Sequence, residues 1–176
     1  QAGGNIRVSG GLPMLKKPLT AQVQWNGKQI IVQRASTQGV NVSGAIAVQF
    51  PETGTPEIAD FNLDVAANNF NLKNTGFDIP GDITLAGLLD FNGKLTGTPA
   101  IPQATGKIKL RNLQVSDWEF DPVLAGNVNF QGGQGGGLRL TGKQDEIALN
   151  INGDYRPTSF LLRTNGAIAA GIIDGD

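Results

Sequence analysis

The side chains of this chain that could do chemistry are carboxylates and hydroxyls, because the sequence contains no histidine and no cysteine. A serine nucleophile therefore lacks its usual imidazole base, and no Gly-x-Ser-x-Gly elbow surrounds any serine. A zinc site lacks its nitrogen and sulfur ligands. We therefore predict a non-enzymatic protein with no catalytic residues, no metal site and no cofactor.

Aspartates are frequent enough to raise the question of calcium binding. None of them belongs to an Asp-x-Asp-x-Asp-Gly loop, which is the spacing that surrounds Ca²⁺ in a short loop. Solvated strand faces and turns are therefore the better interpretation. The aspartates considered are Asp60, Asp64, Asp78, Asp82, Asp90, Asp117 and Asp121.

A glycine-rich run, Gly132-Gly133-Gln134-Gly135-Gly136-Gly137, has the composition of a phosphate-binding loop. No Lys-Ser or Lys-Thr follows it, and it precedes an alternating strand pattern rather than a helix. The run predicts an exposed, flexible hairpin loop instead. Trp25 and Trp118 could stack on sugars, although a lone tryptophan is more often a core or rim residue.

Composition excludes two further classes of function. The net charge is −1, so the chain has no basic surface for nucleic acid. Hydrophobic residues make up 39% of the chain, but their runs are far shorter than the ~20 residues that span a bilayer. The chain must use its apolar residues in another way.

Those apolar residues alternate with polar ones along most of the sequence. Successive side chains of a strand point to opposite faces, so the alternation predicts half-buried strands with one apolar face. Asn26-Gly27 predicts a two-residue turn that pairs Val23 with Ile30 and Ala21 with Val32. Asn92-Gly93 resembles such a turn, but the alternation runs through it, so we expect a continuous strand there.

The chain also repeats itself. A shift of 43 residues places Thr53-Gly54-Thr55-Pro56 on Thr96-Gly97-Thr98-Pro99. We expect a single array over 1–176, with repeat units at 40–82 and 83–125 and degenerate flanking units at 1–39 and 126–176. Each unit is predicted to contain a strand, a turn, a second strand and a bulge. The bulge is predicted because two consecutive apolar positions are three residues apart, rather than two, at Ala67–Phe70 and at Leu110–Leu113.

An all-β array with one apolar face has two outcomes. The antiparallel or mixed sheet can curve and stay open as a trough with an apolar interior, or it can close as a β-sandwich or barrel. Periodicity alone does not decide between them.

The second repeat resembles the recurring segment of the TamB family. The similarity covers Leu89-Asp90-Phe91-Asn92-Gly93-Lys94-Leu95-Thr96-Gly97-Thr98-Pro99 and continues to Leu113, and it is weaker at 54–72. The motif is a strand with glycine, a turn with two prolines, and a Gly-x-apolar-x-apolar strand. The resemblance is clearest over residues 40–155.

This resemblance implies an open, taco-shaped trough in a long envelope protein of the AsmA-like bridge class. Such a protein lies in the periplasm, is anchored in the inner membrane by a segment outside this sequence, and partners a BamA-related outer-membrane barrel such as TamA. Its implied function is to shield phospholipid acyl chains, or nascent outer-membrane β-strands, in transit between the membranes. The open alternative is an extracellular β-sandwich module for adhesion or carbohydrate binding.

Carried onto this sequence, the resemblance implies a lipid-contacting groove lined by the inward side chains of the matching strands. No nucleic acid is expected as a partner. The expected lining is Val40, Val42, Ile46, Val48, Phe61, Leu63, Val65, Ile83, Leu85, Leu89, Phe91, Leu95, Ile108 and Leu110, followed by Val128, Phe130, Ile147, Leu149 and Ile151.

Overall fold

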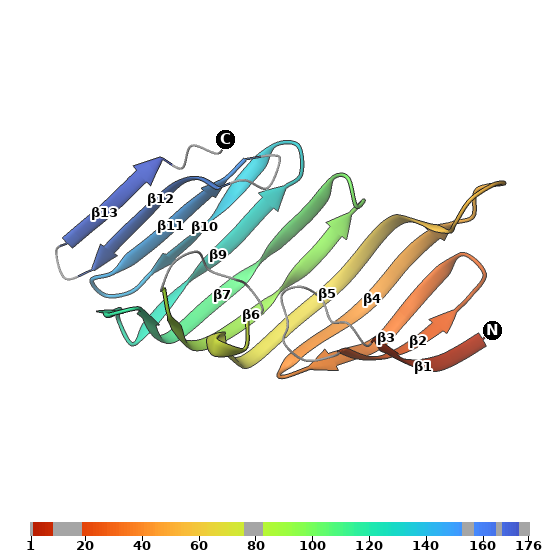
Figure 1. Ribbon diagram of the computed structural model, residues 1–176, viewed down its shortest axis with the longest axis horizontal. Coiled ribbons are helices and arrows are strands. Elements are labelled where there is room, and N and C mark those ends of the chain that lie inside the picture. Colours follow the sequence, from red (N-terminus) through yellow and green to blue (C-terminus); the bar gives the residue numbers. More distant parts are fainter. Residues whose placement is uncertain (1, 9–18, 76–82, 153–156, 165–166, 173–176) are drawn as a thin grey trace.

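The computed structural model is a single layer of antiparallel strands (Figure 1). It describes residues 2–8, 19–75, 83–152, 157–164 and 167–172. The strands form one 13-stranded sheet in the order β1-β2-β3-β4-β5-β6-β7-β9-β10-β11-β12-β13, with the short β8 paired to β7. Neighbours in the sheet are therefore almost always neighbours in the sequence, as expected for an array of hairpins.

The strands vary from short to very long. Their bounds are β1 Ala2–Val8, β2 Leu19–Trp25, β3 Gln29–Thr37, β4 Val40–Gln49, β5 Glu57–Asn71, β6 Leu85–Gly97, β7 Pro102–Val115, β8 Trp118–Glu119, β9 Val123–Gln131, β10 Gly135–Thr141, β11 Glu146–Ile151, β12 Pro157–Thr164 and β13 Ala167–Ile172. One 3₁₀ turn, η1 Leu72–Asn74, follows β5. The described part of the chain holds no helix long and apolar enough to cross a bilayer.

The sheet is open. β1 and β13 lie at opposite ends of the strand order and do not pair with each other, so the sheet is not closed into a barrel (Figure 1). No second sheet covers it among the described residues. The predicted all-β open array is confirmed, and the alternative of a closed sandwich or barrel is wrong.

The two predicted bulges are confirmed. The β5–β6 register shifts between Ala67 and Phe70, and the β6–β7 register shifts opposite Asn112. Asn69 and Asn112 are 43 residues apart, and both adopt a φ of 51°. Asparagine tolerates this left-handed conformation better than most residues do. Each bulge keeps the following apolar residue on the same face as those before it.

The first hairpin forms, but its predicted register is wrong. Val23 pairs with Val32 and Ala21 with Ala35, rather than with Ile30 and Val32. The central turn residues are Gly27 and Lys28, since Asn26 N–H donates to the Gln29 carbonyl. The Asn26 side chain accepts the N–H groups of Lys28 and Gln29 at 3.0 and 2.8 Å. Asparagine thus closes this turn from its first position.

Two other local predictions have mixed outcomes. β6 runs through Asn92-Gly93 without a turn, as expected, but it begins at Leu85, so Ile83 lies outside the strand. The expected glycine-rich loop is shorter than predicted, because Gly135–Gly137 belong to β10. The turn is closed by Gln134 N–H donating to the Gln131 carbonyl at 3.1 Å.

Candidate apolar groove

The register separates the side chains of β2 to β11 onto two chemically distinct faces. One row across the sheet pairs Val65 with Gly93, Gly106 with Val128, and Leu138 with Leu149. We call the face that contains this row the apolar face. Over the described strands β2 to β11 it carries apolar residues, glycines, Pro102 and Thr37, but no charged side chain.

The charged side chains of these strands lie on the opposite, polar face. Asp64 of β5 pairs with Lys94 of β6 at 2.8 Å, and Arg139 of β10 contacts Glu146 of β11 at 2.6 Å. These cross-strand pairs are exposed to solvent or partly so, and each stabilises the sheet only weakly. Their main consequence is that one face is solvated and the other is left for apolar contacts.

Arg111 and Asp90 form an ion pair of 2.9 Å beside the Asn69 bulge. Asn69 N–H donates to Asp90 Oδ1 at 2.8 Å, and Arg111 also contacts the Asn69 side-chain oxygen. The backbone N–H of Asn69, together with Arg111, holds the pKa of the Asp90 carboxyl below its ordinary value. The contacts connect β5, β6 and β7 on the polar face where the bulge interrupts the ladder.

The structure brings the expected lining residues together on the apolar face, with one exception. Ile83 precedes β6 and is 46% exposed. Phe130 is on the face but buried, at 5%. The remaining residues of the expected lining are partly exposed, neither sealed nor fully solvated. The apolar face is therefore a surface whose side chains remain partly accessible, because no other described strand packs on top of it.

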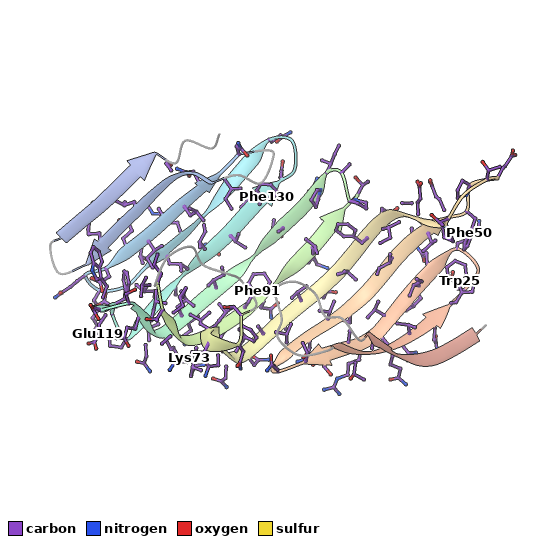
Figure 2. The ribbon with its side chains drawn as sticks, in the orientation of Figure 1. Trp25, Phe50, Lys73, Phe91, Glu119 and Phe130 are labelled. Atoms are coloured by element: carbon purple, nitrogen blue, oxygen red, sulfur yellow. The ribbon has the colours of Figure 1, made fainter. Side chains whose placement is uncertain are left out.

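Phe91 shapes the middle of this face (Figure 2). Its ring lies over Gly93 and Gly106, so that a Cβ on Gly106 would fall 2.6 Å from Phe91 Cε2. The two glycines are paired across β6 and β7. Because neither has a side chain, they leave room for the ring to lie close to the backbone of the sheet.

One border of the apolar face is closed. Leu72 of η1 and Phe120, which follows β8, form a buried cluster with Leu113, Leu124 and Leu140. The last three residues belong to β7, β9 and β10, so Leu72 and Phe120 pack from outside the strands onto the face. Leu124 and Leu140 are 0% exposed as a result. We call these five residues the closed border.

A hydrogen-bonded clasp reinforces the closed border. Asp121 accepts the N–H groups of Gln144 and Asp145 at 2.7 and 3.0 Å, and Asp145 accepts the N–H of Asp121 at 2.5 Å. These backbone donors, Gln144 first and Asp145 second, hold the pKa of Asp121 below its ordinary value. The clasp ties the segment before β9 to the turn between β10 and β11.

The opposite border is open and edged with apolar side chains. Phe50 and Ile58 flank the β4–β5 connection and are 61% and 50% exposed, and Ile101 in the β6–β7 turn is 55% exposed. Phe50 contacts Trp25 edge to face, with ring centroids 5.5 Å apart (Figure 2). We call Phe50, Ile58 and Ile101 the apolar lip.

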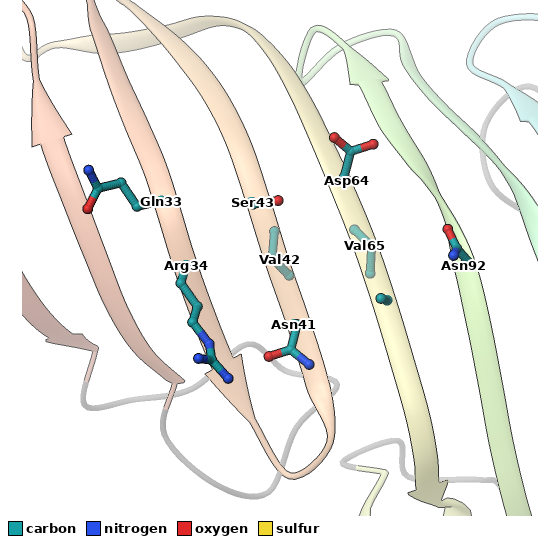
Figure 3. A pocket seen from close by; sticks show the side chains of 9 residues that line it. Gln33, Arg34, Asn41, Val42, Ser43, Asp64, Val65 and Asn92 are labelled. Carbon is teal, nitrogen blue, oxygen red and sulfur yellow. The ribbon is translucent and has the colours of Figure 1, made fainter.

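Two hollows lie away from the centre of the apolar face. One of about 350 Å³ is lined mainly by polar side chains, among them Arg34, Asn41 and Asp64 (Figure 3). Another lies beside the turn at Gly27. Both are shallow, and each has charged and amide side chains in its lining. Among the described residues no cluster of three metal-ligating side chains occurs, and Asp78 and Asp82 lie outside those residues.

Sequence reasoning missed both borders of the groove. Leu72 and Phe120 fall outside the alternating strands and Ile101 falls in the β6–β7 turn, so periodicity could not assign them to a face. Ile58 belongs to β5 and pairs with Val48, and Phe50 directly follows β4, but their exposure at the end of the hairpin is not visible in the alternation. Trp118, considered for sugar stacking, is 42% exposed in β8. One signal in the sequence was available: apolar residues continue to alternate after the predicted bulges, at Phe70 and Leu72 and at their repeat counterparts Leu113 and Val115. This alternation indicated that the apolar surface extends past the bulges.

Comparisons with protein-family models, with curated proteins and with solved structures find no match to this chain.

Proposed function

We propose that the apolar face of this sheet binds lipid acyl chains, and that the chain is a segment of a TamB-like envelope protein that shields lipid in transit between membranes. The observation that carries the proposal is the partly exposed, charge-free face that extends across β2 to β11 and that no other described part of the chain covers with a second layer. The sequence motif at 89–113 is the separate support for the TamB-like assignment.

Burial of hydrocarbon supplies the binding energy. Removing one CH₂ group from water is worth about 0.8 kcal/mol, so a few acyl carbons on the face hold a lipid. The headgroup needs water and remains outside the groove. Cross-strand rows of similar apolar residues offer many sites of similar affinity, which permits movement along the sheet. A BamA-related barrel such as TamA is the proposed partner of the whole protein.

The test places the same charge on the two faces of one strand. Leu95→Lys puts an ammonium group on the apolar face, and Thr96→Lys puts it on the polar face one residue away. The measurement is transfer of a fluorescent phospholipid from phosphatidylcholine vesicles to each folded variant. We expect Leu95→Lys to bind at least about tenfold less lipid, a loss of about 1.4 kcal/mol, and Thr96→Lys to match the unsubstituted protein.

Equal lipid capture by both folded variants would contradict acyl-chain binding. Thermal unfolding followed by circular dichroism separates this result from misfolding. A nascent β-strand as cargo predicts a different outcome: the unsubstituted protein captures an unfolded outer-membrane-type peptide and no lipid.

A further inference from the structure

The two borders of the apolar face differ, and this difference gives the groove a direction along the strands. The strands are antiparallel hairpins, so the β4–β5 and β6–β7 connections lie at one border, and η1 and β8 lie at the other (Figure 1). Leu72 and Phe120 pack onto the face at the border of η1 and β8, whereas no such pair packs onto the described part of the other border. Ile83, Trp118 and Val123 are exposed near the first border as well, at 42–46%, but less than the 50–61% of the apolar lip. A guest therefore meets different surfaces at its two ends.

We infer that an acyl chain lies parallel to the strands, with its methyl end against the closed border and its headgroup beyond the apolar lip. This inference rests on the proposed function. At the closed border Leu72 and Phe120 stand on the face and bury Leu124 and Leu140 completely, so the surface that a tail meets there on the apolar face is hydrocarbon. The lip offers apolar contact to the first carbons of a tail, beside turns that are open to water.

The length of the open face fits one tail of membrane-lipid size. From Leu110 to Pro102, β7 extends for eight residue steps, or roughly 26 Å at about 3.3 Å per residue. One leaflet of a bilayer has a hydrocarbon depth of about 15 Å, half of the ~30 Å core. A single tail therefore fits lengthwise between the lip and the closed border, whereas two tails do not fit end to end.

A second copy of the chain is a less suitable occupant. Two sheets pack face to face about 10 Å apart over flat surfaces. Leu72 and Phe120 stand on the face beside β7, β9 and β10, so they obstruct a flat partner. A narrow and flexible hydrocarbon chain avoids them.

The orientation is tested with two photoactivatable phosphatidylcholines, which carry a diazirine either at the methyl end or near the carbonyl of the acyl chain. We expect the methyl-end probe to label residues around Leu89 and Leu110, and the carbonyl-end probe to label residues around Leu95 and Ile101. The same labelling pattern from both probes, or the reverse pattern, would overturn the orientation. No labelling of the apolar face by either probe would instead overturn the proposed function.

The role of the lip is tested with the exposed triple variant Phe50→Ser, Ile58→Ser and Ile101→Ser. We expect the rate of lipid capture from vesicles to fall about tenfold while the melting temperature changes little. The control is Val123→Ser, which alters an apolar residue with 42% exposure at the opposite border, on the polar face across from Arg111, and it should leave the rate unchanged. An unchanged rate in the triple variant, or an equal loss in the control, would show that tails do not enter over the lip.

Discussion

At the scale of single residues, Asn112 occupies a strained backbone conformation at the second bulge. Its φ of 51° places it in the left-handed region, which costs a non-glycine residue roughly 1–2 kcal/mol. Glycine removes the strain, and a β-branched residue increases it. We expect Asn112→Val to lower the free energy of unfolding by about 1–2 kcal/mol relative to Asn112→Gly, as measured by urea denaturation. Equal stabilities would contradict a bulge at this position.

Asp121 makes stability depend on pH through its clasp. Because backbone N–H donors lower its folded pKa, its contribution is present above the ordinary carboxyl pKa near 3.8 and is lost as the pH falls through the folded value. The free energy of unfolding should therefore decrease with acidification below about pH 4.

Asp121→Asn is the corresponding variant. Its amide does not titrate, so its stability should vary less with pH in that window, and the two proteins should differ most near neutrality. Urea denaturation across a pH series measures both curves. Parallel curves for the two proteins would mean that Asp121 does not titrate with folding.

At the scale of elements, the two borders should respond differently to truncation of a phenylalanine. Phe120 is 7% exposed in the closed border, and Phe50 is 61% exposed in the lip. We expect Phe120→Ala to cost about 3–5 kcal/mol, and Phe50→Ala to change stability by no more than about 0.5 kcal/mol. Chemical denaturation of both variants measures this difference, and similar costs would show that the borders are equally buried.

The strands and bulges were predictable because they follow from local spacing. Alternation placed the apolar residues of β4 to β11 on one face, and a three-residue spacing located the bulges at Asn69 and Asn112. The register of the hairpin around Gly27 was harder to predict. If the two central residues of the turn shift by one position along the chain, every residue pair of the hairpin changes. The backbone hydrogen bond from Asn26 N–H to the Gln29 carbonyl and the side-chain contacts of Asn26 together favour the observed register.

At the scale of the molecule, sequence periodicity could not choose between an open and a closed sheet. The same alternation fills the interior of a sandwich and lines a trough. The difference is whether a second layer covers the apolar residues, and this is a property of the whole arrangement. The closed border could not be predicted from periodicity for the same reason. Leu72 and Phe120 contact the cluster that includes Leu140 only when the intervening strands have formed the sheet.

The absence of cysteine from the sequence permits a direct measurement of whether the apolar face is accessible. Leu95→Cys reports on the open face, Thr96→Cys on the polar face, and Leu140→Cys on the fully buried closed border. Maleimide labelling of each folded variant should modify Leu95→Cys and Thr96→Cys, but Leu140→Cys only after unfolding. Added phosphatidylcholine should slow labelling of Leu95→Cys alone. Labelling of Leu95→Cys that requires unfolding, as for Leu140→Cys, would contradict an open apolar groove.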